Sequence, residues 1–210
     1  NAAFKVEKYI HSYPNCWRTD KPILYYPMDS WFIEVNKIRD RLTSLNQKIN
    51  WKPKATGEKR FKNWLANATD WNLSRSRFWG IPLPLWRSED GQNELVVGSV
   101  AELYSEIEKS IKKGLMDSNP LIKFEVGELS DSNYEKIDLH KHIVDEIVLS
   151  SPDGIPLFRE KDLIDVWFDS GAMPYAQWHY PFENKDKIDM RTDFPADYIA
   201  EGVDQTRGWF

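Results

Sequence analysis

A polar cluster suited to holding a nucleotide or sugar lies in the stretch AEGVDQTRGWF, residues 200–210. Glu201 and Asp204 are carboxylates that can accept ribose hydroxyls at the end of a strand, and Gly202 lets the backbone come close to a ligand. Gln205 adds a neutral donor and acceptor. The alternative is a solvated turn ahead of a helix N-terminus, which also favours acidic residues. On the residues alone, the solvated turn is favoured.

A second cluster is DVWFDSG, residues 165–171. An aromatic run with two aspartates, closed by Ser-Gly, predicts a buried strand followed by a tight turn. In such a strand Trp167 would belong to the core, the usual place of a tryptophan. The functional alternative makes its ring one flat wall of an apolar ligand pocket.

The third candidate is SRSRFWG, residues 74–80. Arg75 and Arg77 alternate, so in extended backbone both side chains lie on one face. Paired arginines beside a cleft suit a phosphate or an RNA backbone. The alternative is ordinary surface charge.

Metal and nucleophilic chemistry find little support. His140 and His142 could form half of a metal site, but no cysteine or further histidine at ligand spacing completes it. The single cysteine, Cys16, excludes an intrachain disulfide and is interpreted as a packed thiol. The sequence has no glycine-rich phosphate loop, no serine nucleophile elbow and no convincing Cys-His pair. We therefore predict no metal in this chain.

Composition limits the class of protein. Of 210 residues, 41% are hydrophobic and 29% charged, which is typical of a globular chain. A net charge of -5 gives no overall basic field, so any RNA contact must be local. No run approaches the roughly 20 apolar residues that span a bilayer, and no signal peptide is present. We expect a cytoplasmic protein without membrane association. Because it begins without Met and ends on aromatic rings, we expect a piece of a longer one.

Three helices are predicted from helical spacing of apolar residues. The first is an amphipathic helix of about four turns from Val35 to Ile49, and the second carries its apolar face from Phe61 to Ala68. The third begins at a capping box, Ser99 with Glu102, runs through residue 111 and ends near Gly114.

Strands and turns are expected around these helices. Residues 9–33 should form short strands and extended connections, while 115–137 should be loop with at most one strand. Residues 143–149 and Tyr198–Ala200 are strand candidates. Asp-Gly pairs at 90–91 and 153–154 predict hairpin turns. The polar section at about 87–160 interrupts an aromatic body that resumes afterwards.

Taken in order, five segments resemble consecutive blocks of the isoleucyl-tRNA synthetases, which are class I aminoacyl-tRNA synthetases. The blocks are HSYPNCWRTDKPILYY, SWFIEV, NWLANATDWNLSRSRFWGIPLPLW, DVWFDSGAMPYAQWHYPFEN and FPADYIAEGVDQTRGWF. They span nearly the whole chain. The valyl and leucyl enzymes share SR-R-WG and D-W--S in looser form.

The resemblance implies a specific chemistry. The family activates L-isoleucine with ATP and magnesium to isoleucyl-adenylate and transfers it to tRNA(Ile), and we expect the parent to act as a monomer. It implies that Glu201, Gly202, Asp204 and Gln205 contact the adenylate. It further implies that Trp167 and Trp209 wall the isoleucine side chain, which reverses the preference for a solvated turn and a core tryptophan.

The resemblance also implies a domain plan. The fold class is α/β, mixed α and β: part of a Rossmann-type catalytic domain with a small α+β insert. Residues 1–33 would return from the editing insertion, 34–86 and 161–210 would belong to the catalytic domain, and 87–160 would be the connecting insert. Some relatives bind zinc in that insert, but WRSEDGQ and SSPDGIP here contain no cysteine, so we expect a metal-free insert.

Two motifs of the family, the HIGH type and the KMSKS type, do not occur in the chain. We therefore expect the isolated piece to be inactive, with residues 201–210 disordered or displaced. Three alternatives stay open at this point: a fragment of a valyl or leucyl sister enzyme, a carbohydrate-binding or carbohydrate-cleaving module, and an RNA-contacting connector without a ligand.

Overall fold

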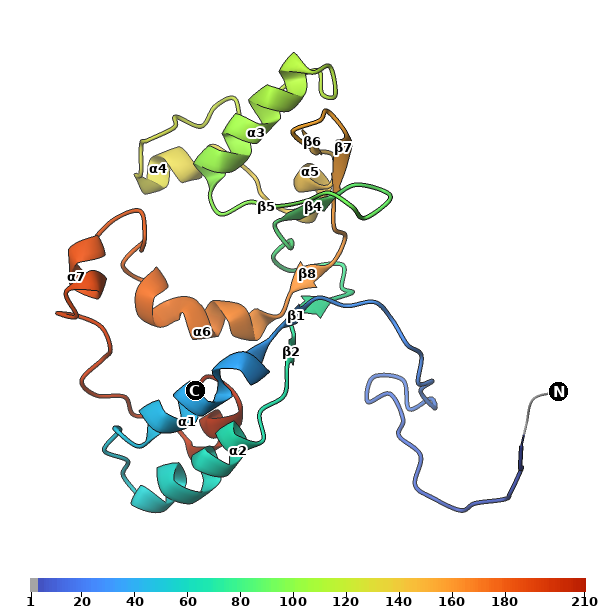
Figure 1. Cartoon of the computed structure of the whole chain (residues 1–210), viewed down its shortest axis with the longest axis vertical. Helices are drawn as coiled ribbons and strands as arrows, with labels where there is room; N and C mark the ends of the chain where they lie inside the picture. The colour runs from blue at the N-terminus through green and yellow to red at the C-terminus, as the bar shows by residue number, and fades with distance from the viewer. Residues whose placement is uncertain (1–3) are drawn as a thin grey trace.

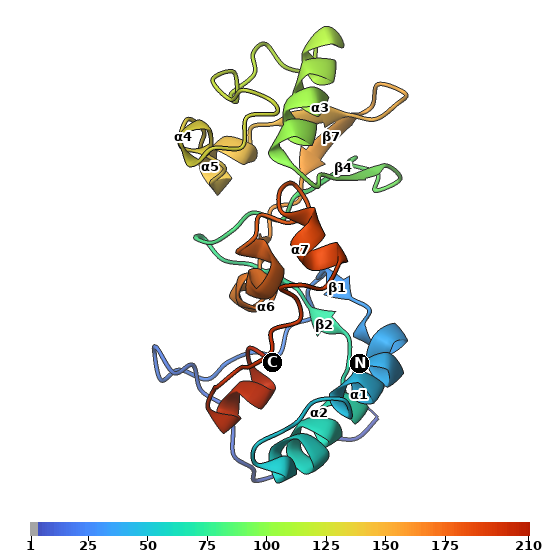
Figure 2. The same ribbon diagram turned by 90° about the vertical axis from the view of Figure 1, so that its left-hand side faces the viewer.

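The computed structural model describes residues 4–210, which fold into mixed helices and strands arranged as two lobes (Figure 1). We call residues 85–159 the insert lobe and the remainder of the folded chain the body. Helix α6, Val166–Ala176, lies between the insert lobe and the helices at the far end of the body in both ribbon views (Figure 2). Every strand pair described between residues 4 and 210 is antiparallel.

A four-stranded sheet forms one side of the insert lobe, with strand order β5-β4-β7-β6. Its strands are β4 Leu85–Arg87, β5 Glu94–Val96, β6 Val148–Ser150 and β7 Pro156–Arg159. Both predicted hairpin turns are confirmed: Gly91 joins β4 to β5 at φ +69°, and Gly154 joins β6 to β7 at φ +86°. A glycine adopts this left-handed backbone without steric cost, which explains the Asp-Gly pairs.

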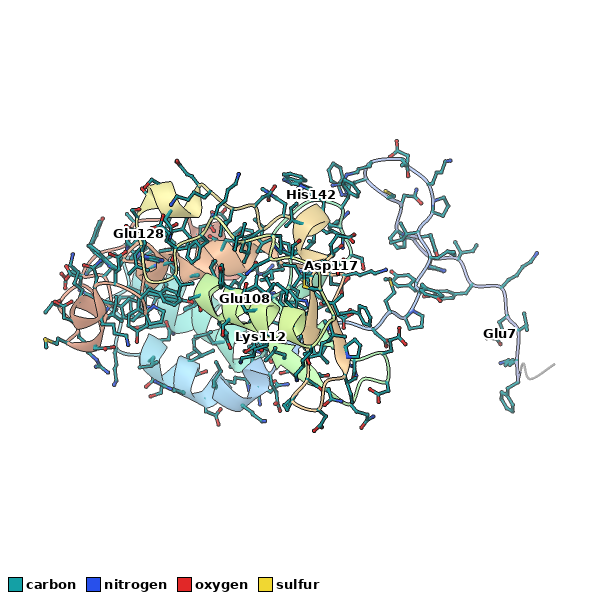
Figure 3. The ribbon with its side chains drawn as sticks, turned by 90° about the horizontal axis from the view of Figure 1, so that it is seen from above. Glu7, Glu108, Lys112, Asp117, Glu128 and His142 are labelled. Atoms are coloured by element: carbon teal, nitrogen blue, oxygen red, sulfur yellow. The ribbon has the colours of Figure 1, made fainter. Side chains whose placement is uncertain are left out.

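Helix α3, Val100–Lys112, packs its apolar face on this sheet and confirms the predicted capped helix. Leu103 and Ile107 point into a core that also contains Trp86, Leu149 and Leu157. The indole of Trp86 donates to the Ile147 carbonyl at 2.8 Å, so even the largest core side chain has its polar atom satisfied. Figure 3 shows Glu108 and Lys112 along α3 as seen from above.

Replacing Ser99 with alanine should weaken the start of α3. Ser99 Oγ accepts from the Glu102 backbone N–H at 3.0 Å, and the Glu102 carboxylate accepts from the Gly98 N–H at 2.7 Å. Losing such a cap costs about 1 kcal/mol. Amide hydrogen exchange should therefore show roughly fivefold lower protection in the first turn of α3. Unchanged exchange there would mean that the cap contributes nothing.

The connection after α3 differs from expectation in two places. Residues 115–137 contain a short helix, α4 Asp131–Tyr134, and no strand within the described chain. Only the end of the 143–149 segment joins a strand, β6, because α5, Lys141–Val144, occupies its start. The apolar run is buried in both halves, with Val144 and Ile147 in the core, so burial did not distinguish helix from strand.

The body is held by two pairs of short strands and two helical segments. Strand β1, Phe32–Ile33, pairs with β2, Trp71–Asn72, and β3, Ser74–Arg75, pairs with β8, Leu163–Ile164. The first predicted helix is present as a 3-10 turn, Val35–Ile38, followed by α1, Arg39–Asn46. The second comprises a π-helical turn, Thr56–Phe61, and α2, Lys62–Ala66. The two helices pack side by side in Figure 1.

Residues 4–31 run along the outside of the molecule without regular strands, except for one bridge between Asn15 and Pro22. Figure 3 shows Glu7 far from the packed lobes. Cys16 was expected to be packed, but it is only half-buried in a turn. A hydrogen bond with the Thr19 side chain is the main cause that lowers the pKa of its thiol.

Two strand predictions in the last section are wrong. The DVWFDSG stretch forms the start of α6, because the Asp165 carboxylate accepts from the Trp167 N–H at 3.0 Å and begins a helix there. Tyr198–Ala200 has no regular structure and is exposed, since no neighbouring strand among residues 4–210 supplies backbone partners. The section also contains α7, Lys185–Asp189, and a 3-10 turn, Val203–Arg207.

Candidate functional site

A cavity of about 370 Å³ lies between α6 and the end of the described chain. Four residues singled out in the sequence line it together, and they come from segments about 35 residues apart: Trp167, Glu201, Gln205 and Trp209. The remaining lining residues are Ser170 and Met173. The cavity thus combines two indole rings with a carboxylate and a carboxamide.

Helix geometry explains the α6 wall. Trp167, Ser170 and Met173 follow one another at intervals of three, so they lie on the same face of the helix. Ser170 and Met173 were not predicted, because in the strand expected for this stretch residues three apart point to opposite faces. The helical spacing itself was the signal that could have found them.

The opposite wall is a turn stabilised by its own hydrogen bonds. The Gln205 N–H donates to the Gly202 carbonyl at 3.0 Å, and the Gln205 side-chain oxygen accepts from the Trp209 N–H at 3.1 Å. The buried hydroxyl of Thr206 accepts from the Arg60 guanidinium at 2.9 Å, which ties the turn to the π-helical turn of the body.

The ring of Phe210 extends this attachment. Its centroid lies 5.6 Å from that of Trp51 and 6.2 Å from that of Phe61, in edge-on contacts typical of aromatic packing. Apolar and polar contacts both attach residues 201–210 to the body, which contradicts the expected disorder, whereas a displacement relative to the parent protein stays a prediction.

The two walls touch directly. The indole N–H of Trp209 donates to the backbone carbonyl of Ser170 at 2.6 Å. Close approach also requires Gly208, because a Cβ there would lie 2.8 Å from the Gln205 side-chain oxygen and 3.2 Å from the Trp167 ring. The cavity is therefore closed at this end by packed aromatic and backbone groups.

Gly202 and Asp204 lie beside the cavity and do not line it. Gly202 begins the 3-10 turn, and a Cβ at that position would come within 2.5 Å of an Asp204 carboxylate oxygen. Asp204 itself is exposed. Because the exposed Asp204 side chain can rotate away, this contact does not require glycine at 202, and the role of both residues toward a ligand remains a prediction.

Arg75 has a partner inside the protein. Its guanidinium forms an ion pair with the buried carboxylate of Asp165 and donates to the Asn72 carbonyl at 2.8 Å. The same carboxylate accepts from the Trp71 indole at 3.2 Å. Asp165 therefore connects β2, β3 and the N-terminus of α6, and it fixes the helix that carries Trp167.

Arg77 and Arg75 both line a second, larger cavity of about 900 Å³ between the body and the insert lobe. Arg77 is exposed, and within residues 4–210 its guanidinium makes no hydrogen bond or ion pair. Asp169, from α6, lines the same cavity, and burial raises the pKa of its carboxyl. The two predicted arginines line the same cavity, but Arg75 is already paired with Asp165, whereas Arg77 has no partner within residues 4–210.

An apolar-walled cavity with a few polar groups at its rim is typical of a site for a small ligand that has an apolar part and a polar end. In this chain of mixed helices and strands, the cavity is a candidate ligand site. Residues 18–210 match the family described as tRNA synthetases class I (I, L, M and V). The match covers most of the chain, which therefore belongs to that family.

Curated relatives narrow the assignment within the family. Isoleucine–tRNA ligase of Bacteroides thetaiotaomicron is 64% identical over 212 residues, which cover 100% of this chain and 18% of the relative. That of Porphyromonas gingivalis is 60% identical over 210 residues, with 100% and 18% covered. A probable cytoplasmic isoleucine–tRNA ligase of Dictyostelium discoideum is 48% identical, with 96% and 16% covered. The chain spans less than a fifth of the length of these relatives.

Within residues 4–210, no group of three or more His, Cys, Asp or Glu is placed to hold a metal ion. None of the helices described there is long and apolar enough to cross a membrane. His140 and His142 both contact Asp138, and His140 stacks on Trp79 with ring centroids 4.7 Å apart.

Proposed function

We propose that this chain is part of an isoleucine–tRNA ligase, an enzyme that activates L-isoleucine with ATP and transfers it to tRNA(Ile). The observation that supports the proposal best is the cavity shared by Trp167, Trp209, Glu201 and Gln205. It unites positions that the family resemblance assigns to amino acid and adenylate. The identity of 60–64% to isoleucine–tRNA ligases favours the isoleucyl branch over a valyl or leucyl sister.

The chemistry of the cavity suits the two ends of the ligand. Two indole faces provide the apolar surface that a branched aliphatic side chain requires. Glu201 and Gln205 provide acceptors for an ammonium group or ribose hydroxyls, and Gly202 and Asp204 extend this polar edge along the chain. An apolar wall separates isoleucine from valine by only about 1–3 kcal/mol, so the complete enzyme needs an editing site elsewhere.

The remaining parts of the proposal concern the complete protein. ATP would bring magnesium with it, and we assign that ion to no residue of this chain. We propose a cytoplasmic, monomeric enzyme, in line with the Dictyostelium relative named cytoplasmic. The insert lobe would be the metal-free connecting insert at 87–160. The stretches 34–86 and 161–210 would contribute to the catalytic domain, and 1–33 would lead back from the editing insertion.

Amino-acid-dependent ATP–pyrophosphate exchange by the complete protein tests this function. We expect exchange with isoleucine, weaker exchange with valine and little with leucine. Preference for valine or leucine would assign the chain to a sister enzyme. Absence of exchange with all three would refute the proposal, and a glycan-binding screen would then test the carbohydrate alternative.

A local contact with tRNA or phosphate is proposed for Arg77, because its guanidinium is exposed and has no partner within residues 4–210. Arg77→Ala should lower tRNA affinity a few-fold and reduce the salt dependence of binding by about one unit of slope. Filter binding of tRNA at several salt concentrations measures both. Arg41→Ala, an exposed arginine on α1, is the matched control. Equal slopes for wild type and Arg77→Ala would contradict the contact.

A further inference from the structure

The Ser170 carbonyl that accepts the Trp209 indole belongs to the backbone of α6. In a regular α-helix this carbonyl would accept the N–H of the residue four positions later. That residue is Pro174, which lies inside α6 and has no N–H. The helix therefore cannot form this bond, and the carbonyl is available to a group outside the helix.

We propose that Pro174 is a positioning residue for the amino-acid pocket: it leaves the Ser170 carbonyl open to hold the Trp209 ring opposite Trp167. The inference rests on the proposed function and deepens it, because it says how one wall of the isoleucine pocket is kept in place. Pro174 does not line the cavity itself and acts only through the Ser170 carbonyl.

The contacts of Trp209 explain why this bond matters. Its backbone N–H is held by the Gln205 side chain at 3.1 Å, and its indole N–H is held by the Ser170 carbonyl at 2.6 Å. The backbone bond fixes the position from which the side chain starts, and the indole bond restricts rotation of the ring about its side-chain torsions. Without the indole bond only the backbone end is held, and the wall facing Trp167 becomes adjustable. A pocket that adjusts discriminates less well between isoleucine and the smaller valine.

A proline inside a helix otherwise destabilises it. Residues that are unfavourable for the local structure are expected at functional sites, where they serve the site. A positioning role for Pro174 can therefore be distinguished from a purely structural role. Replacing Pro174 should keep or raise the stability of α6 while impairing the pocket, whereas a purely structural proline would change both in the same direction.

The test uses the complete protein and four variants: Pro174→Ala, Pro174→Ser, Trp209→Phe, and the double variant Pro174→Ala with Trp209→Phe. Alanine and serine both restore an N–H that competes for the Ser170 carbonyl, and phenylalanine keeps a ring without the indole N–H. Each single variant should raise the KM for isoleucine about fivefold, the value of one ordinary hydrogen bond, with little change in kcat. Each should also lower the preference for isoleucine over valine in ATP–pyrophosphate exchange.

The decisive comparison is the double variant. Because both single changes break the same bond, the double variant should be no worse than Trp209→Phe alone. Hydrogen exchange of α6 should show equal or higher protection in Pro174→Ala. Controls are Trp178→Phe, whose indole N–H finds no acceptor within residues 4–210, and Pro152→Ala in the exposed turn between β6 and β7. Both control variants should leave amino-acid-dependent ATP–pyrophosphate exchange unchanged.

The outcomes distinguish the positioning role of Pro174 from the proposed function. Wild-type exchange with isoleucine, combined with additive effects or with unchanged KM and preference in both Pro174 variants, overturns the positioning role and leaves the proposed function standing. Absence of isoleucine exchange by the wild-type protein refutes the proposed function, and the positioning role with it.

Discussion

Trp167→Ala should lower kcat/KM for isoleucine in ATP–pyrophosphate exchange by roughly 30–150-fold, which corresponds to about 2–3 kcal/mol of lost apolar contact. The indole lines the cavity together with Trp209, so its removal takes away one of the two aromatic walls. Trp167 is 48% exposed in this structure, so the change should act on ligand binding more than on folding.

The next residue on the same helix provides the matched control for this prediction. Phe168 does not line the cavity and instead packs near Trp71, with ring centroids 6.4 Å apart. Phe168→Ala should therefore leave the isoleucine preference unchanged, and Trp167→Phe should give an intermediate loss. Equal losses for Trp167→Ala and Phe168→Ala would mean that the effect comes from α6 as a whole and would contradict a specific wall.

Asp165→Ala should destabilise α6 by about 3 kcal/mol, because it removes a helix cap and leaves the Arg75 guanidinium without its ionic partner. Asp165 is 5% exposed, whereas the Arg75 side chain is 37% exposed, so water recovers part of the cost at the arginine. Amide hydrogen exchange in the complete protein should show roughly 100-fold lower protection along α6.

The conservative variant separates charge from capping. Asp165→Asn keeps one oxygen, which can still accept from the Trp167 N–H. Its amide nitrogen cannot accept from the Trp71 indole and the Arg75 guanidinium as the second carboxylate oxygen does, and the negative charge is lost. It should lose clearly less protection than Asp165→Ala. Unchanged hydrogen-exchange protection of α6 in both variants would show that this carboxylate does not hold the helix. It would also contradict the inference that Arg75 supports the pocket through Asp165.

Elements with local chemical signals were predictable from the sequence. The Ser99 and Glu102 capping box specified α3, and the Asp-Gly pairs specified both hairpins of the insert lobe. DVWFDSG was mispredicted because an aromatic run suits either a strand or a helix, and the choice depended on the Asp165 side chain folding back onto the Trp167 N–H. The same carboxylate also accepts hydrogen bonds from Trp71 and Arg75, which are about 90 residues away in the sequence.

The candidate site was predictable to the extent that its side chains resemble family blocks. Trp167, Trp209, Glu201 and Gln205 were identified in this way and share one cavity. Ser170 could not be found from side-chain chemistry, because it contributes a backbone carbonyl to Trp209. Its availability depends on a missing N–H at Pro174, which is visible in the sequence only once the helix is known.

The central claim is that the cavity between α6 and residues 201–209 receives the isoleucyl group. The most direct measurement is a crystal structure of the complete protein with a non-hydrolysable isoleucyl-adenylate analogue. We predict that the aliphatic side chain lies between the rings of Trp167 and Trp209, with Glu201 and Gln205 within hydrogen-bond distance of the ammonium or ribose. An analogue bound elsewhere, with this cavity filled by another part of the protein, would contradict the account.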